Sequence, residues 1–141
     1  MTSETTPRPF SGHQRTARRA VAGAALADAL LIMLFAAIGR DAHQRGEILT
    51  GVFLTAWPFL AGAALGWLAA RVWRRPLAVR PSGLAVWIGA VAGGMVLRAV
   101  TGQTVVIAFV VVACLSLGIF LVGYRLLLAG ARRLGWTRSQ R

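Results

Sequence analysis

The chain has 141 residues, of which 57% are hydrophobic and 14% are charged, and its mean hydropathy is +0.65. Such a composition leaves too little polar surface to cover a soluble domain of this size, so it predicts an integral membrane protein. The net charge of +12 would also suit a nucleic-acid-binding protein. We disfavour that class, and expect no nucleic-acid partner, because the arginines stand between apolar runs and form no basic stripe along a polar helix.

Four apolar segments approach the roughly 20 residues that a helix needs to cross about 30 Å of hydrocarbon. They predict an all-α fold, a bundle of four transmembrane helices over about 20–39, 48–70, 84–100 and 104–128. Pro58 interrupts the second segment, but neighbouring helices can satisfy the carbonyl group that it leaves free, so we expect a kink and not an end. Residues 1–19 are then a polar N-terminal tail without fixed structure, and 129–141 a basic tail.

The arginines predict how the bundle is oriented. Thirteen of the sixteen fall in the N-terminal tail, in the loop before the third segment or near the C-terminus, and the other three are Arg40, Arg45 and Arg98. The positive-inside rule then places both termini in the cytoplasm, as in a multi-pass protein of the cell membrane, inner or plasma. A cleaved signal peptide is the alternative for the first segment, but its apolar run is long for one and no good cleavage motif precedes Arg40.

Small residues recur at every fourth position of the second and third predicted helices. The two stripes are Gly62, Gly66 and Ala70 on one helix and Ala85, Gly89 and Gly93 on the next. Spacing of this GxxxG type allows two backbones to approach closely, so we predict that these helices pack along the two stripes. The alternative is that glycine is simply frequent in membrane helices.

Asp28 stands inside the first apolar segment, where an acid costs roughly 3 kcal/mol on the insertion scale. A carboxylate in hydrocarbon needs a partner or a proton, and we predict that Arg98 is the partner. The axial rise of the two helices places these residues about 9 Å apart in height, a gap that two long side chains nearly bridge. The alternative, weighted equally, is that Arg98 reaches the outer surface while Asp28 binds a hydroxyl group or water.

The residues after the first segment predict a polar cluster on the outer face, formed by Arg40, Asp41 and His43. His43 titrates near neutral pH in an ordinary environment, although a surface histidine is more often only solvated. We predict no metal site, because the two histidines fall on opposite sides and Cys114 is the single cysteine, expected to pack as a small hydrophobic residue. No motif for a cofactor or for catalysis occurs, so we predict neither a cofactor nor an enzyme.

Short motifs spread along the chain resemble one family. They are Asp28, FAAIGRDAH at 35–43, TAWPF at 55–59, GGMVLRAVTG at 93–102 and GYR at 123–125. Together they are similar to a small bacterial and archaeal membrane family, domain of unknown function 3054, over about residues 20–130. The resemblance implies a compact multi-helix membrane protein and no particular activity, substrate or cofactor. The characteristic positions that it implies are Asp28, Arg40, His43, Trp57, Pro58, Phe59, Gly94, Arg98 and Arg125.

Two functions fit these observations, and the first is slightly favoured. A small oligomeric transport or proton- or ion-conducting module would use Asp28 and Arg98 as the polar elements of its path. A non-enzymatic membrane partner or assembly factor would use its glycine stripes to bind other helices and its basic cytoplasmic face to bind anionic lipid. An intramembrane enzyme is disfavoured because the spans contain no paired nucleophile and base. The expected partners are the bilayer, anionic lipid and a second copy of the chain.

Overall fold

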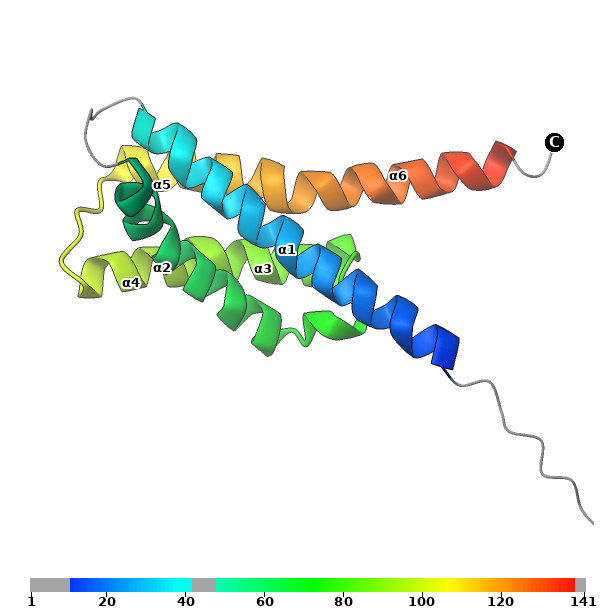
Figure 1. The fold of residues 1–141 in the computed structure, drawn as a ribbon. Coiled ribbons are helices and arrows are strands. Elements are labelled where there is room, and N and C mark those ends of the chain that lie inside the picture. The colour runs from blue at the N-terminus through cyan, green and yellow to red at the C-terminus, as the bar shows by residue number, and fades with distance from the viewer. Residues whose placement is uncertain (1–10, 42–47, 139–141) are drawn as a thin grey trace, which may run out of the picture.

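The computed structural model describes residues 11–41 and 48–138, and within these ranges every regular element is helical. Four helices there are long and apolar enough to cross a membrane: Gln14–Gly39, Leu49–Ala69, Val79–Val100 and Ile107–Gly135. Their arrangement as a bundle is seen in Figure 1. The predicted all-α fold with four helices long and apolar enough to span a membrane is therefore confirmed for the described part of the chain, whereas the orientation of these helices in a membrane stays a prediction.

The first two spans are single α-helices, α1 (Ser11–Asp41) and α2 (Ile48–Ala69). α2 continues through Pro58, as expected for a helix whose neighbours surround it. The predicted start of the first helix is wrong, because α1 begins at Ser11 and not at Ala20. Arginine, alanine and glutamine are good helix formers, so a helix already nucleated inside the membrane extends through them beyond its apolar part.

The third and fourth spans each contain a wider helical turn at a glycine-rich stretch. The third consists of η2 (Val79–Gly83), α3 (Leu84–Ile88), η3 (Gly89–Gly93) and α4 (Gly94–Val100), and the fourth of α5 (Ile107–Leu117), η4 (Gly118–Val122) and α6 (Gly123–Arg138). A short helical turn, η1 (Val72–Arg74), lies between α2 and η2. Because α6 runs to Arg138, most of the predicted C-terminal tail is a continuation of the last helix.

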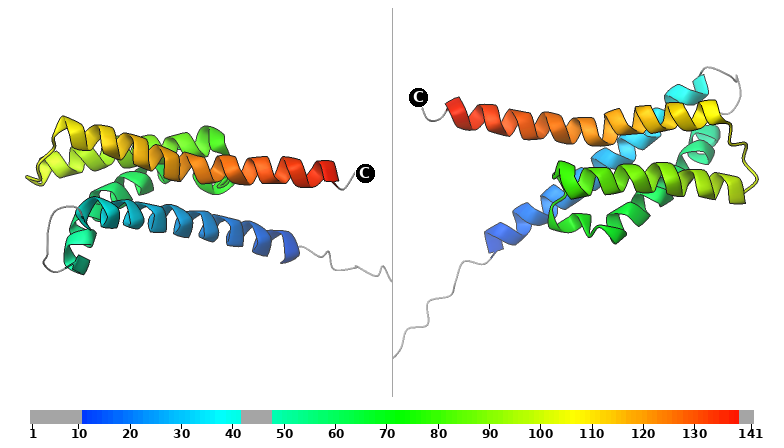
Figure 2. Two further views of the ribbon diagram at one scale, coloured as in Figure 1. Left: turned by 90° about the horizontal axis from the view of Figure 1, so that it is seen from above. Right: turned by 180° about the vertical axis from the view of Figure 1, so that it is seen from behind.

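The start of α1, the connection between α2 and α3, and the end of α6 all lie at one end of the bundle, and the connection between α4 and α5 lies at the other (Figures 1 and 2). An even number of crossings requires this arrangement. We call the first end the basic end, because it carries Arg15, Arg18, Arg19, Arg71, Arg74, Arg75, Arg80, Arg132 and Arg133. The opposite end is the outer end.

The two predicted glycine stripes face each other across α2 and the third span. A β-carbon added at Gly89 would lie 2.6 Å from the carbonyl oxygen of Gly62 and 2.9 Å from the Cα atom of Gly66. One added at Gly93 would lie 2.9 Å from the Cα atom of Gly62, and one added at Gly66 would collide with the carbonyl oxygen of Ala85. The backbones thus touch directly, which is the packing that holds helices together when lipid supplies no hydrophobic driving force.

Three phenylalanine rings close the half of the bundle nearer the outer end. The rings of Phe35 and Phe59 meet edge to face with centroids 5.4 Å apart, and Phe109 lies 6.3 Å from the first and 6.1 Å from the second. Phe35 is on α1, Phe59 on α2 and Phe109 on α5, so the cluster joins three spans. Such pairs contribute about 0.5–1.5 kcal/mol each beyond the area that they bury.

The close contact of α2 with the third span predicts that replacing a glycine by alanine lowers stability at the contact and does not lower it elsewhere. Gly66→Ala and Gly89→Ala should each lower stability in detergent by about 1–3 kcal/mol, because the added methyl group meets backbone that cannot move aside. Gly130→Ala is the matched control, since nothing lies within 4 Å of a β-carbon there, and it should be neutral or stabilising. Thermal unfolding would measure all three, and equal melting temperatures would contradict the packing.

The arginine distribution predicts that the basic end faces the cytoplasm. In a Cys114→Ala background, Thr104→Cys should react with an impermeant thiol reagent added outside intact cells, whereas Gly135→Cys should react only after the cells are opened. Labelling of both positions from the same side would contradict the four-span topology. The reverse pattern would contradict the orientation alone.

Candidate functional site

The two ionisable side chains buried inside the described bundle form one ion pair near its basic end. Asp28 on α1 is 3% exposed and Arg125 on α6 is fully buried. The pair is bidentate, because Nη1 of Arg125 donates to Oδ1 of Asp28 and Nη2 donates to Oδ2, each over 2.8 Å. This parallel geometry is the strongest form of the arginine–carboxylate interaction.

Two further side chains complete the environment of the Asp28 carboxylate. The indole Nε1 of Trp67 on α2 donates to Oδ2 over 2.9 Å, and the hydroxyl group of Tyr124 on α6 donates to Oδ1 over 3.0 Å. Each carboxylate oxygen thus accepts two hydrogen bonds, which fills about four acceptor sites of an ionised carboxylate. The ion pair and these two donors, Asp28, Trp67, Tyr124 and Arg125, are called the charge network below.

Arg125 also connects the charge network to the backbone of the basic end. Its Nε donates to the carbonyl oxygen of Pro76 over 3.1 Å, and its Nη1 donates to that of Leu121 over 2.8 Å. Its guanidinium group lies over the ring of Tyr124, 4.7 Å from the centroid. A β-carbon at Gly83 would lie 3.0 Å from Cδ of Arg125, so this glycine makes room for the side chain. One arginine therefore joins α1, α6 and the connection after α2.

The predicted pairing of Asp28 with Arg98 is wrong. Arg98 lies near the outer end, where its Nη2 donates to the carbonyl oxygen of Thr104 over 3.2 Å and its guanidinium group lies 4.6 Å from the centre of the Phe109 ring. Its Nε is buried without a hydrogen-bond partner among the described residues. The pairing fails because Asp28 meets Trp67 in the last turn of α2, which ends at the basic end, whereas Arg98 is in the last turn of α4, which ends at the outer end.

The remaining predicted residues whose side chains the structure describes do not join the charge network. Arg40 and Asp41 are the last two residues of α1, but their side chains and all of His43 lie outside the described part of the structure. Cys114 has a free thiol, and its carbonyl oxygen accepts a hydrogen bond of 3.0 Å from Nε1 of Trp87. Within the described residues, no three His, Cys, Asp or Glu side chains gather into a group that could hold a metal ion.

Reasoning from the residues placed neither Trp67, Tyr124 nor Arg125 beside Asp28, although the family resemblance had marked Arg125 as a characteristic position. Arg125 was counted with the basic flank, although the apolar run Leu126–Leu128 follows it and places it inside the fourth span. That position was the available signal, since an arginine followed by more apolar residues needs a partner just as Asp28 does. Nothing in the sequence distinguishes Trp67 from the other tryptophans as the donor to Asp28.

The fold and this site define a small all-helical protein with four helices long and apolar enough to span a membrane, in which a buried ion pair links the first of these helices to the last. The chain belongs to the family described as Protein of unknown function (DUF3054), whose sequence profile matches residues 25–128. The resemblance found in the sequence motifs is thereby confirmed, and the matched range contains the whole charge network. No curated protein and no solved structure matches the chain.

The bidentate geometry predicts strong energetic coupling between Asp28 and Arg125. Asp28→Asn and Arg125→Gln should each lower stability by about 3–5 kcal/mol, because each leaves the other charge buried without its counter-ion. The double variant should recover much of that loss. Denaturant unfolding in detergent would give the coupling energy, which we expect to exceed about 1.5 kcal/mol.

The cycle of Asp28→Asn with Arg98→Gln is the matched control. These two side chains have no shared partner in the described structure, so their effects should add to within about 0.5 kcal/mol. Additive effects of Asp28→Asn and Arg125→Gln, together with coupling in the control cycle, would contradict the observed pairing.

Proposed function

We propose that the protein is a non-enzymatic membrane partner or assembly factor, which binds other membrane components as a rigid bundle and does not conduct a solute. The observation that carries this proposal is the fully occupied Asp28 carboxylate. A proton or ion carrier needs a carboxylate that its cargo can reach, whereas all four acceptor positions of Asp28 are filled by protein donors.

The rest of the described interior supports the same proposal. The buried polar side chains there are Asp28, Ser82 and Arg125. Arg125 and Ser82 both donate to carbonyl groups of the connection after α2, at the basic end, and Asp28 is bound to Arg125. The hydroxyl group of Ser82 donates to the carbonyl oxygen of Arg75 over 2.7 Å, so it too is occupied within the connection after α2. Toward the outer end the buried side chains are apolar and include Phe35 and Phe59, which offer no partner for a hydrated ion. The polar side chain that reaches the phenylalanine cluster there is Arg98, which lies over Phe109 and has no acidic partner among the described residues.

The transport function favoured from the sequence stays a prediction, and it would require the structure to change in two places. A cargo would have to displace Arg125 from Asp28, and a second step would have to open the cluster of Phe35, Phe59 and Phe109. Conduction through the bundle as described would therefore need a large rearrangement at both ends. We therefore favour a partner role over transport. In this proposal the protein acts in the cell membrane, with the basic end of the bundle in the cytoplasm.

A flux assay separates the two functions. Purified protein in vesicles of phosphatidylethanolamine and phosphatidylglycerol should not dissipate a pH gradient or a potassium diffusion potential faster than empty vesicles. Asp28→Asn should not change that rate. Flux by the wild-type protein that disappears in a folded Asp28→Asn variant would overturn the proposal and establish Asp28 as a working site in transport.

A further inference from the structure

An apolar groove opens along the bundle between α1 and α2. Its volume is about 360 Å³. α1 contributes Ala25, Asp28, Ala29 and Ile32, α2 contributes Leu60, Ala63, Ala64, Trp67 and Leu68, and Trp73 of η1 completes the wall. Four of these residues are alanines, and their short side chains leave the space that larger residues would fill.

The groove offers a prospective ligand almost no polar contact. Its ionisable side chain is Asp28, which is 3% exposed and has its carboxylate occupied by Arg125, Trp67 and Tyr124. The remaining lining is aliphatic or aromatic. A flexible hydrocarbon chain fits such a lining, because it needs no hydrogen-bond partner and can follow the surface of both helices.

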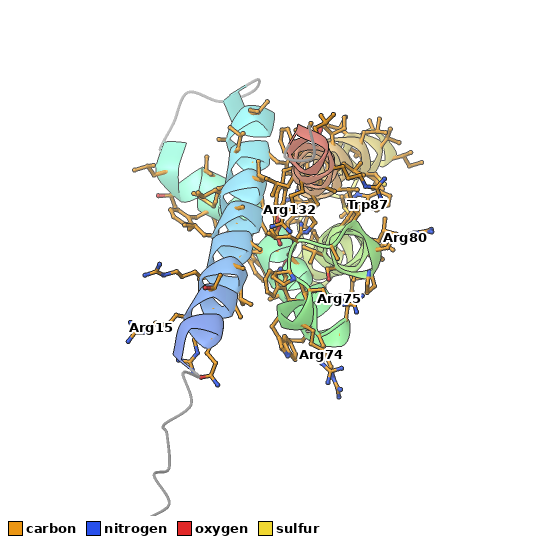
Figure 3. The ribbon with its side chains drawn as sticks, turned by 90° about the vertical axis from the view of Figure 1, so that its right-hand side faces the viewer. Arg15, Arg74, Arg75, Arg80, Trp87 and Arg132 are labelled. Atoms are coloured by element: carbon orange, nitrogen blue, oxygen red, sulfur yellow. The ribbon has the colours of Figure 1, made fainter. Side chains whose placement is uncertain are left out.

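Arginines flank the groove where it reaches the basic end. Arg18 lies on the same face of α1 as Ala25 and Ala29, about two and three helical turns before them. On the other side, Arg74 directly follows Trp73 in the chain. Figure 3 looks onto this end and shows Arg15 and Arg74 on opposite sides of the start of α1.

The charge of these arginines is not neutralised within the described structure. The salt bridge found there is that of Asp28 with Arg125, so Arg18 and Arg74 have no acidic partner among the described residues. Arg71 follows α2 and has a left-handed backbone conformation, with a φ of 48°, which turns the chain toward η1. In η1, Trp73 lines the groove and Arg74 is exposed beside it. Each wall of the apolar groove is therefore followed, toward the basic end, by an arginine of the same element.

We propose that this groove is a binding site for an anionic phospholipid, with one acyl chain lying between α1 and α2 and the phosphate group held by Arg18 and Arg74. Charge complementarity selects this occupant. The wall supplies the apolar contact that an acyl chain needs, and the two arginines supply the cations that a negatively charged headgroup needs at the membrane surface. The inference does not depend on whether the bundle conducts a solute, since the groove lies beside the charge network and not through it.

Tryptophan quenching tests the site directly, because Trp67 and Trp73 line it. The full chain would be placed in phosphatidylcholine vesicles containing a small fraction of either phosphatidylglycerol or phosphatidylcholine with brominated acyl chains. The difference in fluorescence quenching between the wild-type protein and the Trp73→Phe variant is the contribution of Trp73, and it reports contact of brominated acyl chains with the groove. We expect stronger quenching by brominated phosphatidylglycerol at equal mole fraction, and a decrease in this preference as salt is raised.

Charge variants decide whether the selectivity belongs to this site. Arg18→Gln and Arg74→Gln should each weaken the relative affinity for phosphatidylglycerol about fivefold, as expected for one arginine near a membrane surface. The double variant Arg132→Gln/Arg133→Gln is the control, since it removes the same kind of charge from α6, which contributes no residue to the groove. An equal loss of preference in this control would reduce the effect to general charge attraction and overturn the site.

A second variant tests the apolar groove itself. Ala64→Leu should fill the groove and reduce quenching by both brominated lipids, whereas Ala92→Leu, at an exposed alanine outside the groove, should not. Equal quenching of the wild-type protein by the two lipids would show ordinary solvation and overturn the proposal. Absence of quenching by either lipid, with cross-linking of Ala64→Cys into a dimer, would show instead that a second copy covers the groove, which also overturns it.

Discussion

The burial of one carboxylate inside an apolar bundle is the constraint on which the arrangement of the basic end depends. An ionised group removed from water is tolerated only when a counter-ion and hydrogen-bond donors replace the water. Asp28 obtains these from three residues at two places far along the sequence: Trp67 on α2, and the adjacent Tyr124 and Arg125 on α6. Because every donor must lie within hydrogen-bond distance at once, the relative heights and rotations of α1, α2 and α6 are fixed together.

Three different interactions hold the bundle at three levels. The charge network acts near the basic end, the glycine stripes of α2 and the third span act along the middle, and the phenylalanine rings act toward the outer end. In lipid, helix association relies on close van der Waals contact and on polar contacts, because transfer of an apolar helix surface from lipid to protein brings little gain. The small residues and the ion pair therefore take over the role that a hydrophobic core has in a soluble bundle.

The four spans could be predicted from the sequence, whereas the partner of Asp28 could not. Hydropathy measures a local property, and about 30 Å of hydrocarbon sets the length of each span whatever its neighbours are. Pairing of two charges depends on helix start, tilt and rotation, which packing decides. The height estimate for Asp28 and Arg98 counted from Ala20 and Leu84, and counting from the observed starts, Ser11 and Val79, would bring the two residues only closer, to about 3 Å. Counting residues along each helix therefore cannot show how the helices are shifted and rotated against one another. The packing of the glycine stripes was easier to predict, because residues repeated at every fourth position share one helix face. That inference does not depend on the height of a residue in the membrane.

The charge network also bears on the shape of the groove beside it. Asp28 and Trp67 are members of the network and also line the groove, so the side chains that hold α1 near α2 at this level are themselves held by Arg125. A wall fixed in this way keeps its form without an occupant, and a preformed site loses less conformational entropy when an occupant enters. Replacing a buried ion pair by apolar residues of similar volume is often neutral or stabilising, so stability alone is a weak reason for its presence. The ion pair fixes Asp28 in the wall of an open groove, next to arginines that have no acidic partner among the described residues. An apolar contact at the same place would not serve this purpose, because apolar side chains free to repack would close the space.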